Sequence, residues 1–404
     1  MKIGVVGLGY VGIVTAAVLA NKGNEVVGVD VDQNKIQSLK KGVVPIFEPG
    51  LENLIRNSAM KLNFTDNFNG LEGCEAIFIC VPTPNNKEGI DLAYVLDASK
   101  KVSSCAKDSI LIIKSTVTPG TARVVRKNTG MSVLSNPEFT REGSAVYDTE
   151  HPDRIVIGGD PADICERIWK FTGSEIIKTT NENAELIKYA SNAFLATKIS
   201  FINQIADLCE TIPGADVNVV AKGMGMDRRI GNEFLKAGLG YGGSCFPKDT
   251  KALLSFSLDR NVDLSIIESV ISYNDKRIKE LVSKITDKIG FLRGKKICIL
   301  GLSFKDNTDD LRESRSIRLA QELMRSGAVV KGYDPVVKNT DLMEICDNID
   351  QCISFSEIII TATEWNLFKD LTKEKLSGKK VFDFRRILNL ENSEITMGVG
   401  IGKN

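Results

Sequence analysis

Histidine is almost absent from this chain of 404 residues, because His151 is the only one. It stands in the polar stretch 150–154, where we expect a loop or a domain boundary. Histidine is the side chain that most often carries protons in enzymes. If the chain is an oxidoreductase or a hydrolase, its proton chemistry must therefore rely mainly on lysine, carboxylate or cysteine side chains.

The chain also lacks an excess of charge of either sign, with 52 basic and 52 acidic side chains. This balance argues against a general role on nucleic acid or on a membrane surface, although a local basic patch could still bind phosphate. We find no apolar run of membrane-spanning length and no signal peptide. Because the nine cysteines form no CxxC pair and no zinc-like group, we expect a reduced, cytoplasmic protein without a metal site, in which Cys80 and Cys298 are core residues.

The first residues form a recognisable βαβ pattern. A short apolar strand at 2–7 leads into Gly7-Leu8-Gly9-Tyr10-Val11-Gly12, a helical run follows at 13–20, and a second strand at 25–30 ends in Asp30. Glycines allow a pyrophosphate to approach the backbone, and the helix amino terminus offers unpaired N–H groups. Asp30 can accept hydrogen bonds from ribose hydroxyls and would repel a 2′-phosphate. The pattern therefore predicts a dinucleotide site that prefers NAD to NADP.

Three further strands at 76–81, 109–114 and 131–134 each end in a polar loop. Ligands gather beyond the carboxyl ends of parallel strands, so these loops are candidate walls of a site. Glu138 and Glu142 lie in the third loop, and on a helical turn both carboxylates would share one side. The alternative is a capped surface turn.

A long helical pattern begins at Asn181 and meets no proline before Pro213. This pattern indicates an interior helix, such as one that joins two domains. Lys188 and Asn192 are one turn apart on it and share a face. They are either functional or a solvated pair on the exposed side of an amphipathic helix.

The stretch 240–250 sets Cys245 among glycines, with Lys248 and Asp249 close behind. The glycines can adopt positive φ and admit a ligand. Pro247 would keep a helix from starting early. The charges of Lys248 and Asp249 could shift the pKa of the thiol. A catalytic cysteine and a purely structural turn both remain open. Arg228, Arg229 and Lys236 make the preceding segment basic, which suits a phosphate-bearing ligand.

The last third repeats the βαβ pattern of the first. A strand and turn at 296–303 precede a helix at 317–324 and a strand at 328–334, with later strands at 357–361 and 380–383. A charged run at 306–315 replaces the glycine loop. We predict an α/β protein with two Rossmann-like, doubly wound domains joined by a long central helix and a helical middle region. The expected domains are 1–180, which binds NAD, 181–292, which is central and dimerising, and 293–404, which binds the nucleotide sugar.

Taken together, these motifs resemble the UDP-glucose 6-dehydrogenase family of nucleotide-sugar dehydrogenases over nearly the whole chain. The resemblance is carried by residues 242–249, 229–236, 136–139, 301–305 and 309–314, with the Lys188 and Asn192 pair. It implies that a sugar C6 alcohol is oxidised to the acid at the expense of two NAD, through a thiohemiacetal and a thioester on Cys245. Lys188 and Asn192 would stabilise the oxyanions, and Asp249, Glu142 and Thr116 would position and deprotonate water. The base of the first step stays open among Lys188, Asp249 and Glu142.

The resemblance also implies the binding residues. The sugar nucleotide would contact Glu138, Phe139, Lys188, Asn192, Asn232, Phe234, Leu235, Lys236, Tyr241, Gly242, Lys305 and Arg385. The cofactor would contact Gly7, Gly9, Tyr10, Val11, Gly12, Asp30, Lys35, Thr83, Thr116, Glu142, Lys248 and Arg312, with no defined task for Lys248. Arg229 would reach the substrate of a neighbouring subunit, so we expect a homodimer or a larger homo-oligomer.

Two departures from the family pattern, Pro119 one place late and Thr140 in place of leucine, concern loop and contact detail. The nearest alternative is the same chemistry on UDP-N-acetylmannosamine, UDP-N-acetylglucosamine or GDP-mannose. A two-electron hydroxyacid dehydrogenase would leave Cys245 unexplained and would yield one NADH per substrate. A silent nucleotide-sugar sensor would bind without turnover.

Overall fold

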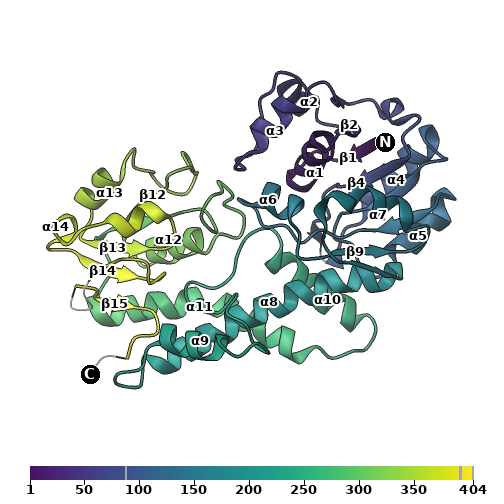
Figure 1. Ribbon diagram of the computed structural model, residues 1–404. Coiled ribbons are helices and arrows are strands. Elements are labelled where there is room, and N and C mark those ends of the chain that lie inside the picture. Colours follow the sequence, from purple (N-terminus) through teal and green to yellow (C-terminus); the bar gives the residue numbers. More distant parts are fainter. Residues whose placement is uncertain (87–88, 391–393, 403–404) are drawn as a thin grey trace. The chain divides into compact units, whose positions relative to one another are not determined.

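The computed structural model describes residues 1–86, 89–390 and 394–402. It consists of two compact units, each with its own sheet (Figure 1). The first unit comprises Met1–Ser191 with Leu258–Arg260, and the second comprises Asn192–Ser257 with Asn261–Asn404.

The first unit is built on a sheet of eight strands in the order β10-β9-β8-β7-β4-β1-β2-β3. Every neighbouring pair is parallel except β8 and β9, which run antiparallel. The strands are β1 (Lys2–Val6), β2 (Glu25–Val29), β3 (Leu62–Thr65), β4 (Ala76–Ile79), β7 (Ile110–Ile113), β8 (Val133–Ser135), β9 (Ile155–Gly158) and β10 (Ile176–Thr179), and a separate hairpin pairs β5 (Asn85–Asn86) with β6 (Gly89–Ile90).

Both faces of this sheet are buried, because successive side chains of a strand point to opposite faces. Ile3 and Val5 of β1 enter one hydrophobic core, whereas Val6 enters the other. In β4, Phe78 belongs to the first core and Ile77 to the second. Such doubly buried strands are apolar throughout, which is why the strand signals in the sequence are continuous runs.

Helices cover both faces of the first sheet. Contacts join α1 to α3 and α6, and join α4 to α5 and η1. The helices are α1 (Tyr10–Asn21), α2 (Gln33–Lys40), α3 (Leu51–Asn57), α4 (Ala93–Cys105), α5 (Thr121–Thr129), α6 (Ala145–Glu150) and α7 (Asp163–Trp169), with 3-10 turns η1 (Phe68–Leu71) and η2 (Lys170–Thr172).

The second unit contains an all-parallel sheet of five strands in the order β12-β11-β13-β14-β15. Alternate residues again divide between two cores, with Ile297 and Ile299 in one and Cys298 and Leu300 in the other. The strands are β11 (Lys296–Leu300), β12 (Val329–Tyr333), β13 (Ile358–Thr361), β14 (Lys380–Asp383) and β15 (Met397–Gly398).

Helix α8 (Asn181–Cys209) is 29 residues long and begins in the first unit and ends in the second. Its buried second half packs in the same core as the five-stranded sheet, through Ile202 and Ala206. The other helices of this half are α9 (Val217–Gly225), α10 (Phe246–Leu258), α11 (Ser265–Ile289), α12 (Arg315–Arg325), α13 (Ile349–Phe355) and α14 (Lys373–Leu376), with the 3-10 turn η3 (Asn366–Asp370).

The predicted fold class is confirmed, since each unit contains its own largely parallel α/β sheet and the long helix α8 lies between the two sheets in the sequence. Two expectations were wrong. Pro247 does not delay a helix, because α10 already begins at Phe246 and Pro247 lies in its first turn, where a missing N–H costs nothing. The expectation of reduced cysteines also fails at Cys298, which is a core residue as predicted but forms a disulfide with Cys352 of α13, 5.7 Å away between Cα atoms. None of the helices in the described residues is both long and apolar enough to cross a membrane.

Candidate active site

The glycine turn after β1 has the geometry of a phosphate cradle. Gly7 adopts a φ of 89° and donates its N–H to Val29 O at 2.8 Å. A Cβ on Gly12 would lie 1.8 Å from Gly7 O, so only glycine lets α1 start against the turn. Gly9, at the amino terminus of α1, faces open space instead. The residues present therefore fit a pyrophosphate placed on the first turn of α1.

Asp30 and Lys35, both predicted to bind the cofactor, meet at the end of β2. The Lys35 ammonium donates to Asp30 Oδ2 at 2.7 Å, and the same oxygen accepts from Leu8 N at 2.8 Å. Burial opposes ionisation, but these donors and Asp32 N lower the pKa of Asp30 below its usual value. Asp30 is therefore an ionised acceptor directly beside the glycine turn.

Glu48, which the sequence analysis missed, links the glycine turn to the loop after β8. Its carboxylate accepts from the Tyr10 hydroxyl, from Gly143 N at 2.7 Å and from Val146 N at 3.2 Å. The contact holds Tyr10 of the cofactor turn next to the residue that follows Glu142. Glu142 itself is half-buried in a turn before α6, so the predicted helical turn from Glu138 to Glu142 does not form.

Lys188 and Glu138 form a buried ion pair in the first unit. The Lys188 ammonium donates to Glu138 Oε1 at 2.9 Å and to Glu138 O at 2.7 Å. Burial would raise the pKa of Glu138, but Lys188 and the Thr140 hydroxyl lower it to about 2. The surface alternatives for both residues were wrong: Lys188 is 3% exposed and Glu138 is 7% exposed. Phe139 lies between cations, 3.9 Å from the Arg154 guanidinium and 5.5 Å from the Lys188 ammonium.

Thr116 and Lys188 line one small pocket beyond β7 and β8. Glu185, one turn before Lys188 on α8, lines it as well. Its carboxylate accepts from Gly120 N at 2.6 Å, Ala122 N at 2.9 Å and the Ser135 hydroxyl at 3.0 Å. Glu185 thus anchors the loop that carries Thr116. The sequence offers no local signal for it, because the three donors come from distant segments.

In the second unit, Cys245 immediately precedes α10. Its carbonyl accepts from Asp249 N at 2.8 Å, so the cysteine lies at the positive end of the helix. The Asp249 carboxylate is buried and accepts from Asn192 Nδ2 and from Lys248 Nζ, both at 2.6 Å. Two of the predicted catalytic residues, Asn192 and Asp249, are therefore in direct contact. Lys248 gains a defined partner in this unit.

Cys245 differs from the buried thiols Cys80 and Cys165 in its exposure. It is half-buried, and the Ser244 hydroxyl lies 3.6 Å from its sulfur. Burial raises the pKa of Cys80 and of Cys165 to about 12, which keeps both thiols protonated and inert.

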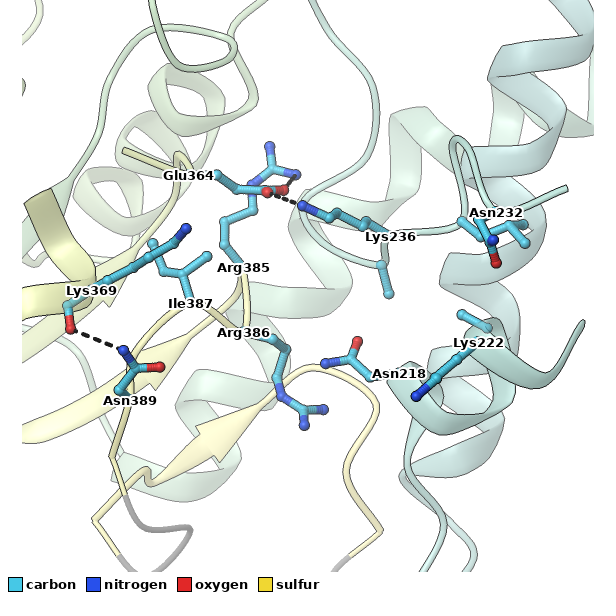
Figure 2. Close-up of a pocket in the computed structure, with 13 residues that line it drawn as sticks. Asn218, Lys222, Asn232, Lys236, Glu364, Lys369, Arg385, Arg386, Ile387 and Asn389 are labelled. Atoms are coloured by element: carbon cyan, nitrogen blue, oxygen red, sulfur yellow. Dashed lines mark hydrogen bonds and ion pairs between the residues drawn. The ribbon is translucent and has the colours of Figure 1, made fainter. Parts of the chain in front are cut away.

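A cavity of about 530 Å³ opens in the second unit beside Lys236 and Arg385 (Figure 2). Lys236 reaches Glu364 at 2.7 Å, and Arg385 donates to Ala362 O at 2.8 Å. The predicted residues Asn232, Leu235, Lys236 and Arg385 all line this cavity, and sequence reasoning missed the other polar lining residues Asn218, Lys222, Glu364, Lys369, Arg386 and Asn389. Five cations against one carboxylate make the cavity suited to a diphosphate.

The remaining predicted residues occupy other places. Tyr241 is 4% exposed and packs in an apolar cluster with Ala196 and Val270. Arg229 is exposed and pairs with Asp227, and Arg312 is exposed and pairs with Asp310. Phe234 has a positive φ and its ring lies near that of Phe246, and Lys305 lies over the Phe304 ring. Gly242 packs against Glu313 O. In the first unit, Val11 is half-buried in α1 and Thr83 is buried after β4.

Comparison with known proteins decides the family. The chain matches the UDP-glucose/GDP-mannose dehydrogenase family in its NAD-binding domain over residues 1–171, in its central domain over 182–276 and in its UDP-binding domain over 298–390. The chain belongs to this family. The predicted cofactor NAD is thereby confirmed, and the match over 298–390 supports a nucleotide-sugar substrate.

Members of the UDP-glucose/GDP-mannose dehydrogenase family match along nearly the entire chain. A UDP-glucose 6-dehydrogenase of Bacillus subtilis is 41% identical, with 97% of this chain and 95% of the relative covered. One of Rhizobium meliloti is also 41% identical, over 94% and 92%. A solved UDP-glucose dehydrogenase of Pyrobaculum islandicum superposes with a TM-score of 0.92 at 36% identity, over 100% of this chain and 98% of the other.

Proposed function

We propose that this protein oxidises UDP-glucose to UDP-glucuronate with two NAD, through a covalent intermediate on Cys245. The observation that carries the proposal is the half-buried thiol at the amino terminus of α10, beside a buried carboxylate that binds Asn192 and Lys248. The relatives of Bacillus subtilis and Rhizobium meliloti, which are named UDP-glucose 6-dehydrogenases, support the choice of sugar.

The first unit would provide the cofactor site and a charged oxygen-binding group. Gly7, Gly9 and the first turn of α1 would hold the pyrophosphate, and Asp30 the ribose. When bound, NAD accepts a hydride from the reacting carbon in each of two oxidations. The Lys188 ammonium, whose counter-charge is Glu138, would stabilise negative charge on the sugar oxygen.

The second unit would provide the thiol chemistry. The Cys245 sulfur attacks the aldehyde carbon, and the new oxyanion accepts a hydrogen bond from the Asn192 amide. Oxidation of this thiohemiacetal gives a thioester, which water hydrolyses to the acid and the free thiol. Asp249 is positioned to orient that water, because α10 holds it one turn after Cys245. The family resemblance also assigns Glu142 and Thr116 to the handling of this water.

The basic cavity would bind the UDP moiety. Lys236 and Arg385 are held beside it by Glu364 and by Ala362 O. Partial burial of Arg385 lowers the pKa of its guanidinium, although Glu364 opposes this shift, and a bound anion would stabilise the charge further. This environment supports a diphosphate ligand without deciding which sugar it carries.

We also propose a homodimer and a three-domain division. Exposed apolar side chains recur every two turns on α8, with Phe194 64%, Phe201 44% and Leu208 55% exposed, and such a stripe is typical of a helix interface. The exposed Arg229 is free to reach a neighbouring copy once its pair with Asp227 opens. Each family match lies within one of the proposed domains 1–180, 181–292 and 293–404, which supports that division.

The test of the chemistry is the stoichiometry of product formation. We expect two NADH per UDP-glucuronate with the parent protein, and a loss of acid formation of more than about a thousandfold in Cys245→Ala. Cys105→Ala is the matched control, because Cys105 is also half-buried but lies in α4 of the other unit. A Cys245→Ala protein that still releases UDP-glucuronate at a near-normal rate would overturn the mechanism.

The choice of sugar needs a separate comparison. A solved UDP-N-acetylmannosamine dehydrogenase of Pyrococcus horikoshii superposes with a TM-score of 0.89 at 27% identity, so this fold also accommodates that sugar. The choice of sugar is decided by the initial rate of NADH formation, measured on UDP-glucose, UDP-N-acetylmannosamine, UDP-N-acetylglucosamine and GDP-mannose. We expect kcat/KM to be highest on UDP-glucose, and a higher value on another sugar would replace the substrate and leave the chemistry intact.

The shared site is tested by mixing two inactive variants. If Arg229 serves the neighbouring subunit, each mixed dimer of Arg229→Ala and Cys245→Ala subunits keeps one intact site, so an equal mixture that pairs at random should regain about a quarter of the parent activity. Sedimentation should show a dimer for the parent and both variants. No recovery on mixing dimeric variants would place Arg229 outside the neighbouring site.

A further inference from the structure

The segment before Cys245 is held by side chains and not by secondary structure. Residues 236–244 lie in neither a helix nor a strand, yet Gly238, Leu239 and Tyr241 are buried. Buried backbone groups need hydrogen-bond partners. Here the partners come from three separate helices of the second unit.

Gly238 marks the first held position. Its N–H donates to Asn203 Oδ1 of α8 at 2.7 Å, and its carbonyl accepts from Arg277 Nε of α11 at 2.9 Å. Asn203 and Arg277 are buried, at 1% and 0% exposure. Both hydrogen-bonding groups of this residue are therefore bound by enclosed side chains.

Tyr241 marks the second held position. Its N–H donates to Asn274 Oδ1 at 2.9 Å, and its carbonyl accepts from Arg315 Nε at 2.8 Å and from Asn274 Nδ2 at 3.1 Å. Arg315 also donates through Nη2 to Asn274 O at 2.7 Å, which joins α12 to α11. Burial lowers the pKa of Arg315 to about 10, so its guanidinium remains charged at neutral pH.

Two glycines of this segment adopt the predicted positive φ, 102° at Gly240 and 80° at Gly243, and the segment also needs glycine for close packing. A Cβ at Gly240 would lie 2.3 Å from Asn274 Oδ1, and one at Gly242 would lie 2.3 Å from Glu313 O. One at Gly243 would lie 2.7 Å from the Phe304 ring. These glycines allow the chain to pack closely against α11 and the loop before α12.

We propose that Arg315 is a positioning residue for Cys245, acting with Asn203, Asn274 and Arg277 as a clamp on the main chain at Gly238 and Tyr241. Charged donors make the stronger hydrogen bonds in such a network. Of the four, Arg315 alone begins a helix of the UDP-binding domain, at the end of the loop that carries Lys305 and Arg312. The clamp thereby ties the geometry of the thiol to that domain.

The role is specific to the thiol step, and this claim rests on the proposed function. Formation of the carbon–sulfur bond requires the Cys245 sulfur to be within reach of the aldehyde carbon, so a loosened turn slows it strongly. The first oxidation uses no thiol. UDP binding uses the cavity at Lys236 and Arg385. Lys236 donates to Glu364 and Arg385 donates to Ala362 O. Arg315 instead donates to Tyr241 O.

The first test is amide hydrogen exchange on the full-length protein without substrate. In Arg315→Met, exchange in the peptide that spans 236–247 should be about tenfold faster. The control is Arg325→Met on the same helix, whose side chain is 70% exposed and pairs locally with Glu322. Unchanged exchange at 236–247 in a folded Arg315→Met would overturn the clamp, whatever the substrate proves to be.

The second test separates positioning from general damage. In single turnovers on UDP-glucose, Arg315→Met should slow the second phase of NADH formation at least about tenfold, with the first phase and KM changed by less than about twofold. Arg315→Lys keeps the charge but not the two-pronged contact, so the rate of its second phase should lie between that of the parent and that of Arg315→Met. If Arg315→Met does not fold, the two phases are compared between Arg315→Lys and the parent protein instead. Equal slowing of both phases, or a rise in KM alone, would overturn the positioning role.

Discussion

The two βαβ repeats of this protein share a framework but differ in the function that it serves. In the first, Gly7 has a φ of 89° and Leu8 N donates to Asp30 at 2.8 Å. In the second, Gly301 has a φ of 90° and Leu302 N donates to Asp334 at 2.8 Å. In both repeats, therefore, a glycine with positive φ follows the first strand and the next N–H donates to the acid that follows the second strand.

The repeats differ in the segment that comes after the turn. Helix α1 begins at Tyr10, directly after the glycines, and Asp30 is 8% exposed beside Lys35. Helix α12 begins only at Arg315, after a charged loop, and Asp334 is 1% exposed. The Asp334 carboxylate accepts from the backbone of Leu302, Ser303, Val336 and Val337 and from the Trp365 indole.

The comparison shows that a carboxylate at the end of the second strand does not by itself indicate ribose binding. The first repeat leaves its acid and its helix amino terminus available to a cofactor. The second uses its acid to build the domain and uses the loop before α12 to support the cysteine turn. Three predictions test this difference, and a fourth, at Glu138, tests the charge balance of the first unit.

Asp334→Ala should have the largest effect on stability. Removing an acceptor shared by so many buried donors should destabilise the second unit by about 3–5 kcal/mol and weaken UDP binding with it. Hydrogen exchange in β11 and β13 measures the first effect, and calorimetric titration with UDP the second. Asp341→Ala, at an exposed position, is the control. A stable Asp334→Ala protein that loses only ligand affinity would make the two acids equivalent.

Acid should weaken the first unit around Glu138. Its folded pKa is about 2 against a usual 4.5, so its ionised form stabilises the fold by about 3 kcal/mol above pH 4.5. That contribution should be lost as the pH falls from about 4.5 to about 2. Hydrogen exchange in β7 and β8 at falling pH, compared with β11, measures it. Glu138→Gln should flatten the dependence and the exposed Glu72→Gln should not, whereas a parallel loss in both variants would contradict the assignment.

Asp30→Ala should affect the cofactor more than the fold. We expect KM for NAD to rise about tenfold to a hundredfold and the preference over NADP to fall, because the repulsion of the 2′-phosphate is removed. KM for UDP-glucose should not change. Steady-state kinetics with both cofactors measures this, with Asp32→Ala, the cap of α2, as the neighbouring control. A loss of folding comparable with that of Asp334→Ala would remove the distinction between the repeats.

Lys35→Met should have the smallest effect. The ion pair with Asp30 is 25% exposed on the lysine side, and pairs of this kind contribute less than about 1 kcal/mol. KM for NAD should rise about threefold and should rise less at high salt, since screening already weakens the pair. The salt dependence of KM is the measurement. A salt-independent effect would show that Lys35 acts by packing.

Local pattern was sufficient for the framework of the protein. The continuous apolar runs predicted β1, β2, β4, β11 and β12, because a strand buried on both faces needs nonpolar side chains throughout. The glycine turn, Asp30 and the long α8 were predicted from spacing alone. Lys188, Asn192, Cys245 and Asp249 were identified as candidates from residue type, and the family resemblance assigned their chemistry.

Contacts between distant segments were decided only by the tertiary structure. Glu48 and Glu185 anchor loops far away in the chain, and no periodicity marks them. Burial turned Lys188 from a possible surface residue into the partner of Glu138. The clamp of Arg315 on Tyr241 joins segments 74 residues apart.

For this protein, the sequence by itself determined the two βαβ frameworks and the cofactor NAD and marked Cys245 as the candidate nucleophile, because each of these signals depends on neighbours within a few residues. Only the tertiary structure decided which acid is available to a ligand and what supports the cysteine turn. The physical reason is that burying a polar group without a hydrogen bond costs free energy, and the partner that satisfies it comes from the segment that the fold places next to it.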